Sequence, residues 1–476
     1  MRLLDLTALQ LGRAIRAGEA SAEEAAQAAL DAIAARQPEH NAYITVLADQ
    51  ALERARALAG RLPGSPLAGV PAGVKDNICT LGVKTSCASK ILGDFAPPYD
   101  ATVMEKFHAA GGIMLGKLNM DEFAMGSTTE TSFYGPVRNP WDPDRVPGGS
   151  SGGAAAAVAA GECWYALGSD TGGSIRQPAA FCGVVGMKPT YGTVSRYGLV
   201  AFASSLDQIG PLTRDVADSA MVMDCIAGHD SRDSTSIRMD KLPYASQLGQ
   251  DIRGIKIALP EEFFGEGLSE DVRKGIQLAA RRFQDLGAEI VRVSMPALTH
   301  ALPAYYIISS AEASSNLARF DGIRYGYRSP DYEDITSLYK NSRSEGFGEE
   351  VKRRIMLGTF ALSSGYYDAY YKKALQVRTL ITRDYSRIFA ACDCILSPVA
   401  PTTAYKIGEK TANPLEMYLG DIYTVPVNIA GLPGLSMPCA AASDGMPVGM
   451  QLIGPAFSEP LLYRVGYAYE TDCQPS

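Results

Sequence analysis

Apolar residues recur at a spacing of three to four through the first sixty or so positions, a pattern typical of amphipathic helices. Two short sequences, Thr7-x-x-Gln10 and Ser21-x-x-Glu24, have the form of capping boxes, and each precedes such a pattern. We therefore predict an N-terminal helical segment, about residues 1–62, that serves as scaffold or docking surface.

Between Pro63 and about residue 210 the apolar runs are short and interrupted by glycine and proline. Beyond this region the pattern predicts a helix at 216–226, followed by a strand at 255–259, a helix at 269–286 that Gly287 closes, and a strand at 289–293. Strands that alternate with helices predict a layered α/β fold.

The remaining third of the chain is predicted to be mostly helical over 301–388, with strand-like patterns at 393–396 and 436–450. The chain has no internal repeat and no linker of biased composition. We therefore predict one domain, 1–476, with the helical segment packed on it.

Composition is that of an ordinary globular protein, with 46% hydrophobic and 20% charged residues. The net charge of -8 would repel a polyphosphate, so a nucleic acid partner is expected to be held by another chain. The basic cluster from Lys352 to Arg354 is interpreted as a solvated helix face. Nine irregularly spaced cysteines, no secretory signal and no run of eighteen apolar residues predict a cytoplasmic protein without a membrane span.

Two glycine-rich segments, 147–153 and 168–176, place serines among glycines. In the second segment, Thr171, Gly172 and Gly173 can direct successive N–H groups toward one point, where an oxyanion would be stabilised. Ser174 follows as a candidate nucleophile. The alternative is a plain glycine-rich turn with a solvated serine, and this stretch alone leaves both interpretations open.

A serine nucleophile needs a base. The four histidines, His40, His108, His229 and His300, are interpreted as surface or structural residues. Lys75 follows an apolar run, at the end of a predicted buried strand, and would act as a base if burial or like charge kept it neutral. A surface lysine paired with Asp76 is the alternative.

Other chemistries find less support in the sequence. Residues around Ser150 and Ser151 match the Gly-x-Ser-x-Gly elbow of α/β-hydrolases, but no histidine stands where that fold needs one. The sequence from Gly111 to Lys117 approaches a phosphate-binding loop, yet Leu118 lacks the required hydroxyl, so we predict a helix-to-strand turn. The pair Cys392-x-Cys394 has no matching ligands, so no metal site is expected.

Three motifs together resemble the amidase signature family: Gly-Val-Lys75-Asp-Asn, Pro-Gly-Gly-Ser150-Ser-Gly-Gly and Gly-Ser-Asp-Thr-Gly-Gly-Ser174-Ile-Arg. The resemblance implies a mixed β-sheet covered by helices on both faces. It also implies that Ser174 is the acyl-forming nucleophile, Ser150 a bridging serine after a cis peptide and Lys75 the base. The N–H groups of Thr171, Gly172 and Gly173 would form the oxyanion hole.

Longer stretches at 119–131, 195–211 and 417–428 are similar to the A subunits of bacterial glutamyl-tRNA(Gln) amidotransferases. This similarity implies that glutamine is held by Tyr305, Arg354 and Asp421. A carboxylate suits the α-ammonium and a guanidinium suits the α-carboxylate. Tyr306, the neighbour of Tyr305, is an alternative for the tyrosine.

The same resemblance implies a heterotrimer with B and C subunits. The B subunit would use ATP and Mg²⁺ and bind the tRNA, so no cofactor is expected in this chain. Ammonia from glutamine would convert Glu-tRNA(Gln), and in some organisms Asp-tRNA(Asn), to the amidated form. Thr193 and the short C-terminus depart from the family pattern. A stand-alone amidase that acts on small amides is the alternative function.

Overall fold

The computed structural model describes residues 2–240, 242–411 and 413–473, which form one mixed eleven-stranded sheet. The strand order is β1-β3-β2-β4-β6-β5-β10-β11-β9-β7-β8. β2 runs parallel to β3 and β4, and β7 runs parallel to β8 and β9, while the other pairs are antiparallel. The strands are β1 (Tyr43–Val46), β2 (Pro71–Lys75), β3 (Ile113–Leu118), β4 (Tyr165–Asp170), β5 (Val185–Lys188), β6 (Gln208–Thr213), β7 (Lys256–Pro260), β8 (Glu289–Val293), β9 (Cys394–Pro398), β10 (Gly434–Ala441) and β11 (Pro447–Ile453).

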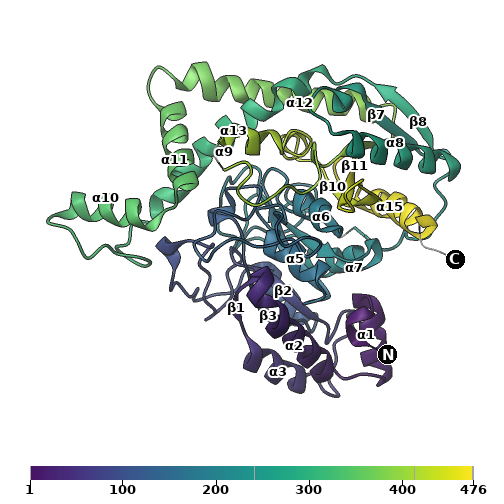
Figure 1. Ribbon diagram of the computed structural model, residues 1–476, viewed down its shortest axis with the longest axis horizontal. Helices are drawn as coiled ribbons and strands as arrows, with labels where there is room; N and C mark the ends of the chain where they lie inside the picture. Colours follow the sequence, from purple (N-terminus) through teal and green to yellow (C-terminus); the bar gives the residue numbers. More distant parts are fainter. Residues whose placement is uncertain (1, 241, 412, 474–476) are drawn as a thin grey trace.

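Helices cover both faces of the sheet, as predicted (Figure 1). Two adjacent residues of β11 show that both faces are covered, because neighbouring positions of a strand point to opposite faces of the sheet. A Cβ on Gly449 would meet Ala180 of α6, whereas the side chain of Val448 lies against Gly275 of α8. The helices are α1 (Ala8–Ala17), α2 (Ala22–His40), α3 (Ala48–Ala57), α4 (Thr102–Ala109), α5 (Gly152–Ala159), α6 (Arg176–Cys182), α7 (Val216–Ile226), α8 (Glu270–Asp285), α9 (Ala301–Asn316), α10 (Ile335–Gly346), α11 (Glu349–Leu362), α12 (Lys372–Phe389), α13 (Pro414–Leu419), α14 (Val425–Ile429) and α15 (Glu459–Cys473).

The N-terminal segment begins as the sequence predicts, with full capping boxes at Thr7 and Ser21. The prediction of helices alone was wrong for residues 43–46. Asn41 adopts a left-handed conformation and ends α2, after which β1 pairs antiparallel with β3. Aromatic and β-branched residues favour a strand there.

The middle of the chain confirms the predicted alternation. α7 spans the predicted residues, and β7, α8 and β8 form a strand-helix-strand unit with β7 parallel to β8. The strand-like pattern at 436–450 contributes to a hairpin of β10 and β11. Gly111 turns the chain from α4 into β3, which places Lys117 inside the strand and agrees with the predicted helix-to-strand turn.

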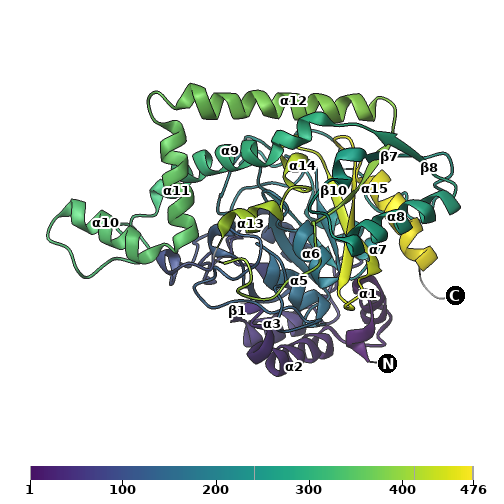
Figure 2. The same ribbon diagram turned by 45° about the horizontal axis from the view of Figure 1, so that its top comes forward.

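The predicted helical region at 301–388 contains α9 to α12 (Figures 1 and 2). α10 projects away from the sheet, and α11 leads from it back toward α12. α11 packs closely on α9 at Gly358, where a Cβ would lie 1.9 Å from the carbonyl oxygen of Ser310. Among the described residues, no helix is long and apolar enough to span a membrane.

Candidate active site

Lys75 is the last residue of β2, which lies between two parallel neighbours, β3 and β4, as the third strand from one edge of the sheet. Its side chain is fully buried, with Nζ at 2.8 Å from Ser150 Oγ and 2.7 Å from Ser151 Oγ. The carbonyl oxygen of Ser169 lies 3.3 Å from the same nitrogen. Lys75 is therefore not a surface lysine.

The environment of Lys75 favours its neutral form. Burial lowers the pKa of Lys75 to about 7, although the negative charges of Asp121, Asp170 and Asp207 oppose that shift. Asp76, the partner in the alternative interpretation, accepts hydrogen bonds from the Ser86 hydroxyl and the Ser86 N–H instead. At neutral pH a substantial fraction of Lys75 is therefore able to accept a proton.

Ser150 lies in the loop that leads into α5, and the Gly149–Ser150 peptide is cis, as the resemblance implies. The Ser151 N–H donates to the carbonyl oxygen of Ser174 at 3.1 Å. The two glycine-rich segments are therefore held together next to Lys75.

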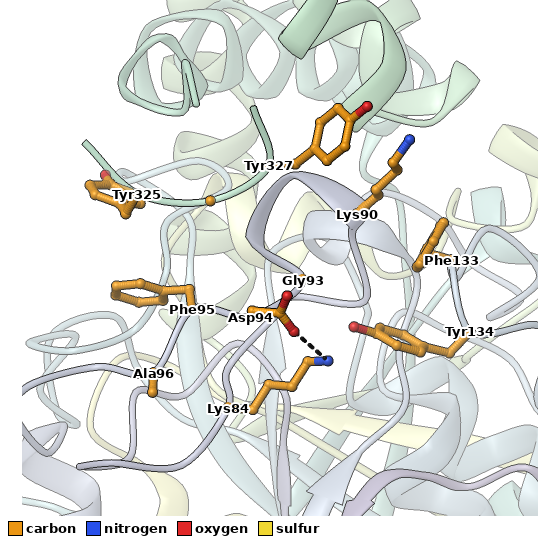
Figure 3. Close-up of a pocket in the computed structure, with 11 residues that line it drawn as sticks. Lys84, Lys90, Gly93, Asp94, Phe95, Ala96, Phe133, Tyr134, Tyr325 and Tyr327 are labelled. Atoms are coloured by element: carbon orange, nitrogen blue, oxygen red, sulfur yellow. Dashed lines mark hydrogen bonds and ion pairs between the residues drawn. The ribbon is translucent and has the colours of Figure 1, made fainter. Parts of the chain in front are cut away.

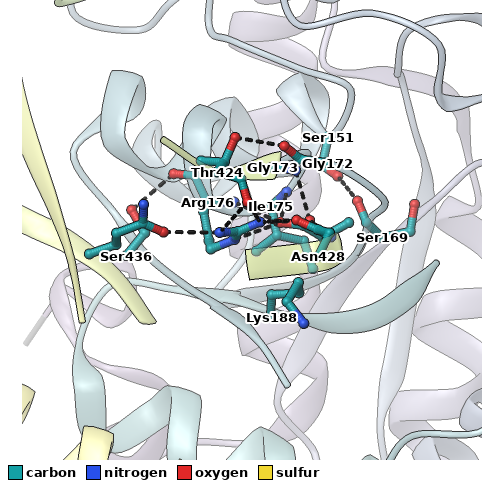
Figure 4. A network of polar contacts seen from close by, with 12 residues as sticks. Ser151, Ser169, Gly172, Gly173, Ile175, Arg176, Lys188, Thr424, Asn428 and Ser436 are labelled. Carbon is teal, nitrogen blue, oxygen red and sulfur yellow. Dashed lines mark hydrogen bonds and ion pairs between the residues drawn. The ribbon is translucent and has the colours of Figure 1, made fainter. Parts of the chain in front are cut away.

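Ser174 lies in the turn between β4 and α6, and Asp170 organises this turn. Figure 4 shows the network of polar contacts here, with Gly173, Ile175 and Arg176. The carboxylate of Asp170 accepts the N–H groups of Gly173 at 2.8 Å and Ile175 at 3.1 Å, and it pairs with the buried guanidinium of Arg176 at 3.1 Å. Burial alone would raise the pKa of Asp170, but Arg176 lowers that pKa to about 2. A permanent buried ion pair thus fixes the turn that presents Ser174.

The Ser174 side chain is only 7% exposed, and its hydroxyl has no hydrogen-bond partner among the described residues. The N–H of Gly173 is committed to Asp170, which takes Gly173 out of the predicted set of oxyanion donors in this structure. The N–H groups of Thr171, Gly172 and Ser174 make no hydrogen bond within the described part of the chain. The Ser174 N–H was not among the predicted donors.

Arg354 lies on α11 and is 2% exposed, so the predicted solvated helix face was wrong for this member of the basic cluster. Its Nε donates to Glu350 Oε1 at 2.8 Å. The guanidinium carbon lies 4.8 Å from the ring centroid of Tyr306 and 5.2 Å from that of Tyr418. The terminal nitrogens Nη1 and Nη2 donate to no group among the described residues.

Asp421 follows α13, in a turn that contacts the Ser174 loop. Thr424 joins the two, because its hydroxyl donates to the Gly172 carbonyl at 2.6 Å and lies 3.1 Å from the Asp421 carbonyl. The Asp421 carboxylate accepts from Tyr306 Oη at 2.8 Å and from Ser127 Oγ at 2.9 Å. Burial raises the pKa of Asp421 to about 7.

Tyr305 and Tyr306 both reach this region, at different places. A Cβ on Gly172 would lie 2.4 Å from Tyr305 Oη, so Tyr305 packs directly on the turn that contains Ser174. Tyr306 contacts Asp421 and the guanidinium of Arg354. The structure thus brings Tyr305, Tyr306, Arg354 and Asp421 together beside Ser174.

Other candidate groups lie elsewhere. Among the described residues none of the four histidines hydrogen-bonds to Lys75, Ser150 or Ser174, and His40 pairs with Glu162. Cavities of this chain also occur away from these residues. One of about 450 Å³ is lined by two lysines and several aromatic rings, but Lys84 pairs with Asp94 and Lys90 lies over the ring of Tyr327 (Figure 3).

Several contacts of the site were not predicted from the sequence. All but one of the residues involved lie inside the motifs and stretches that carry the resemblance, but the sequence assigns them no role, and Glu350 lies outside those stretches. The residues are Ser127, Ser151, Asp170, Glu350, Tyr418 and Thr424.

Known proteins are similar to this chain over nearly its whole length. The amidase family model matches residues 24–463. The A subunit of glutamyl-tRNA(Gln) amidotransferase from Thermoanaerobacter pseudethanolicus is 58% identical over 473 residues, which cover 99% of this chain and 97% of that protein.

Solved structures agree as well. The crystal structure of the A subunit of glutamyl-tRNA(Gln) amidotransferase from Thermotoga maritima is 43% identical with a TM-score of 0.82, and covers 99% of this chain and 95% of its own. A bacterial aryl acylamidase of the amidase signature family has 28% identity and a TM-score of 0.87, with coverage of 98% and 96%. With a family match over most of its length and relatives that align from end to end, this chain belongs to the amidase signature family, in the group that contains the A subunits of glutamyl-tRNA(Gln) amidotransferase.

Proposed function

We propose that this chain is the glutamine-hydrolysing A subunit of a tRNA-dependent amidotransferase. The observation that carries the proposal is a buried lysine between two serines beside the Ser174 turn, with the guanidinium of Arg354 and the carboxylate of Asp421 close by and joined through Tyr306. The first group suits amide hydrolysis through a serine, and the second suits the two charges of an α-amino acid.

Hydrogen-bond geometry supports one proton arrangement for neutral Lys75. The Ser169 carbonyl can only accept, and the Ser151 hydroxyl lies 3.1 Å from that same carbonyl, to which it donates. Lys75 therefore directs its two N–H groups to Ser169 and Ser151, and its lone pair is left for the hydroxyl of Ser150. Ser150, with its own proton given to Lys75, would accept the proton of Ser174.

The reaction follows from this arrangement. Ser174 Oγ attacks the amide carbon of glutamine, and the oxyanion lies at the free N–H groups of Thr171, Gly172 and Ser174. The intermediate collapses as the relay returns a proton to the amide nitrogen, so that ammonia leaves and the acyl group stays on Ser174. Water then attacks the ester by the same route and releases glutamate.

Substrate selection follows from the charges around Asp421 and Arg354. The unused Nη1 and Nη2 of Arg354 form a fork for the α-carboxylate of glutamine, and the carboxylate of Asp421 accepts from the α-ammonium. Tyr305, packed on Gly172, would line the path between these charges and Ser174.

The relatives' names support a role as one subunit of a larger enzyme. We propose that a B subunit receives the ammonia, uses ATP and Mg²⁺ to activate Glu-tRNA(Gln), and binds the tRNA, with a C subunit that braces the pair in the cytoplasm. The net charge of -8 is consistent with tRNA binding by another chain.

A stand-alone amidase is the second candidate, because the aryl acylamidase superposes on this chain with a TM-score of 0.87. The fold therefore accommodates both activities. Arg354 and Asp421 favour the first, since an enzyme for apolar amides has no need for an amino-acid clamp.

The test is ammonia release by the purified chain, wild type beside Ser174→Ala, from glutamine, asparagine and an apolar amide, alone and with co-expressed B and C subunits. We expect preference for glutamine and complete loss in Ser174→Ala. Fast turnover of the apolar amide without response to glutamine or to partners would refute the glutaminase assignment.

A further inference from the structure

Glu350 lies in the first turn of α11, four residues before Arg354, so both side chains project from the same side of the helix. It is 6% exposed, although it carries a charge. One of its oxygens accepts from Arg354 Nε and from the hydroxyl of Tyr418, each at 2.8 Å. Arg353 pairs with its other oxygen.

The contacts of Glu350 continue as far as Asp421. Tyr418, which donates to Glu350, stacks on Tyr306 with 4.1 Å between ring centroids. Tyr306 in turn donates to Asp421. Glu350 is therefore one end of a continuous set of contacts that joins the guanidinium and the carboxylate of the proposed glutamine clamp.

The hydrogen bond at Nε decides which part of the guanidinium is free. Arg354 has a long side chain with many rotamers, and it recognises a carboxylate well only when two N–H groups point the same way. With Nε held by Glu350 and the guanidinium packed against the rings of Tyr306, Tyr418 and Phe202, Nη1 and Nη2 are left as a fork for a carboxylate. Without Glu350 the guanidinium would lose its only hydrogen bond among the described residues.

Charge balance points the same way. Arg353 and Arg354 carry two positive charges, and Glu350 and Asp421 can carry two negative charges. The charges of these four side chains balance, which suits a zwitterion with no net charge. Loss of Glu350 would leave an excess of positive charge where an amino acid binds.

We infer that Glu350 is a positioning residue for glutamine: it orients Arg354 toward the α-carboxylate and so sets the preference for an α-amino acid amide over a simple amide. This inference rests on the proposed glutaminase function. Glu350 touches no reacting atom, so its effect should appear in substrate binding and not in the chemistry at Ser174.

A purely structural role makes a different prediction. A glutamate in the first turn of a helix stabilises that helix through its dipole, and loss of such a residue would weaken all activities together with the folded state. Glu349 provides a matched control, because it occupies the same turn but is exposed and pairs only with Lys352 among the described residues.

The experiment measures kcat and KM for glutamine and for a small apolar amide, with the chain assembled with its partner subunits. The variants are Glu350→Ala, Glu350→Gln and Glu349→Gln. We expect Glu350→Ala to raise KM for glutamine by about 10- to 100-fold, the range for a lost charge-assisted hydrogen bond, while kcat at saturation and KM for the apolar amide stay within about threefold. Glu350→Gln keeps an acceptor for Arg354 and should give a smaller rise, and Glu349→Gln should match wild type.

Three results would overturn the inference. The first is a KM for glutamine that is the same in Glu350→Ala as in Glu349→Gln. The second is a fall of kcat in Glu350→Ala that is equal for both substrates. The third applies if the thermal midpoint shows that Glu350→Ala does not fold. In that case, an unchanged KM for glutamine in Glu350→Gln and in Tyr418→Phe would overturn the inference. Wild-type turnover of the apolar amide without any of glutamine would instead remove the proposed function, and the role of Glu350 with it.

Discussion

The group of Lys75, Ser150 and Ser174 and the group of Arg354 and Asp421 lie side by side but are built in different ways. Lys75, Ser150 and Ser174 come from strand ends and turns of the sheet, within about a hundred consecutive residues, and all are buried among backbone groups. Arg354 and Asp421 come from helices and turns added over residues 301–430, and rings and carboxylates of distant segments hold them.

This difference separates chemistry from selection. A proton relay needs fixed distances, and inner strands of a sheet provide them because they are held on both sides. A binding pocket needs particular charges, and surrounding helices can supply these without a change in the strands. Substitutions in the two regions should therefore have different kinetic signatures.

The largest effect is expected for Lys75→Ala. Loss of the base should lower kcat by about 1,000-fold or more with glutamine and with an apolar amide alike, since general acid-base groups contribute about 100- to 10,000-fold. Ammonia release at saturating substrate measures this, beside a thermal melt. Retained activity with either substrate would remove lysine from the relay.

Arg354→Ala should have a large but selective effect. We expect KM for glutamine to rise about 100-fold, as a lost charge-assisted pair predicts, and KM for an apolar amide to stay near that of wild type. Steady-state kinetics with both substrates checks this. A similar change for both amides would mean that Arg354 supports the fold and not the substrate.

A change of pH should affect kcat through Lys75 and KM for glutamine through Asp421, and the change in kcat should be about tenfold. Burial places the pKa of Lys75 near 7, so its neutral form is present above that pH and is lost below it. kcat should therefore fall as pH decreases from about 8 to about 6, by roughly tenfold, for both substrates. KM for glutamine alone should rise over the same range, because Asp421, with a pKa raised to about 7 by burial, becomes protonated and loses its charge.

The measurement is the pH dependence of kcat and of KM, each with glutamine and with the apolar amide. Tyr306→Phe removes a hydrogen bond that favours the Asp421 carboxylate, so the rise in KM should begin at a higher pH in that variant. An unchanged glutamine profile would show that Asp421 does not bind the α-ammonium.

The smallest effect is expected for Ser151→Ala, compared with Ser150→Ala. Both hydroxyls contact Lys75, but that of Ser151 is directed to the Ser169 carbonyl and does not transfer a proton. We expect kcat to fall by about tenfold or less in Ser151→Ala and by at least about 100-fold in Ser150→Ala. Equal losses in the two variants would contradict the proton arrangement.

The sequence predicted these regions unequally. Lys75, Ser150 and Ser174 stand in short motifs with a chemical logic of their own, and the alternation of strands and helices predicted the α/β layers. β1 was missed because its four residues lie inside a helical pattern. The commitment of Gly173 to Asp170 could not be seen either, because a row of glycines does not reveal which N–H groups are already used.

The pocket around Arg354 was predicted only through resemblance. Ser127 and Tyr418 lie in stretches that carry the resemblance, and Glu350 lies outside them, but none of the three has a role that the sequence assigns, because contacts of the folded chain create those roles. Neither periodicity nor composition carries information on such contacts. Only the folded chain brings them together.

Gly358 limits which parts of the substrate site can be changed. Since a Cβ at this position would overlap the Ser310 carbonyl, α11 cannot tolerate a side chain there without a shift away from α9. Gly358 thus sets the spacing between the helix of Tyr305 and the helix of Arg354. A redesign for another substrate can therefore exchange the side chains at 305, 354 and 421 and treat the helix pair as rigid.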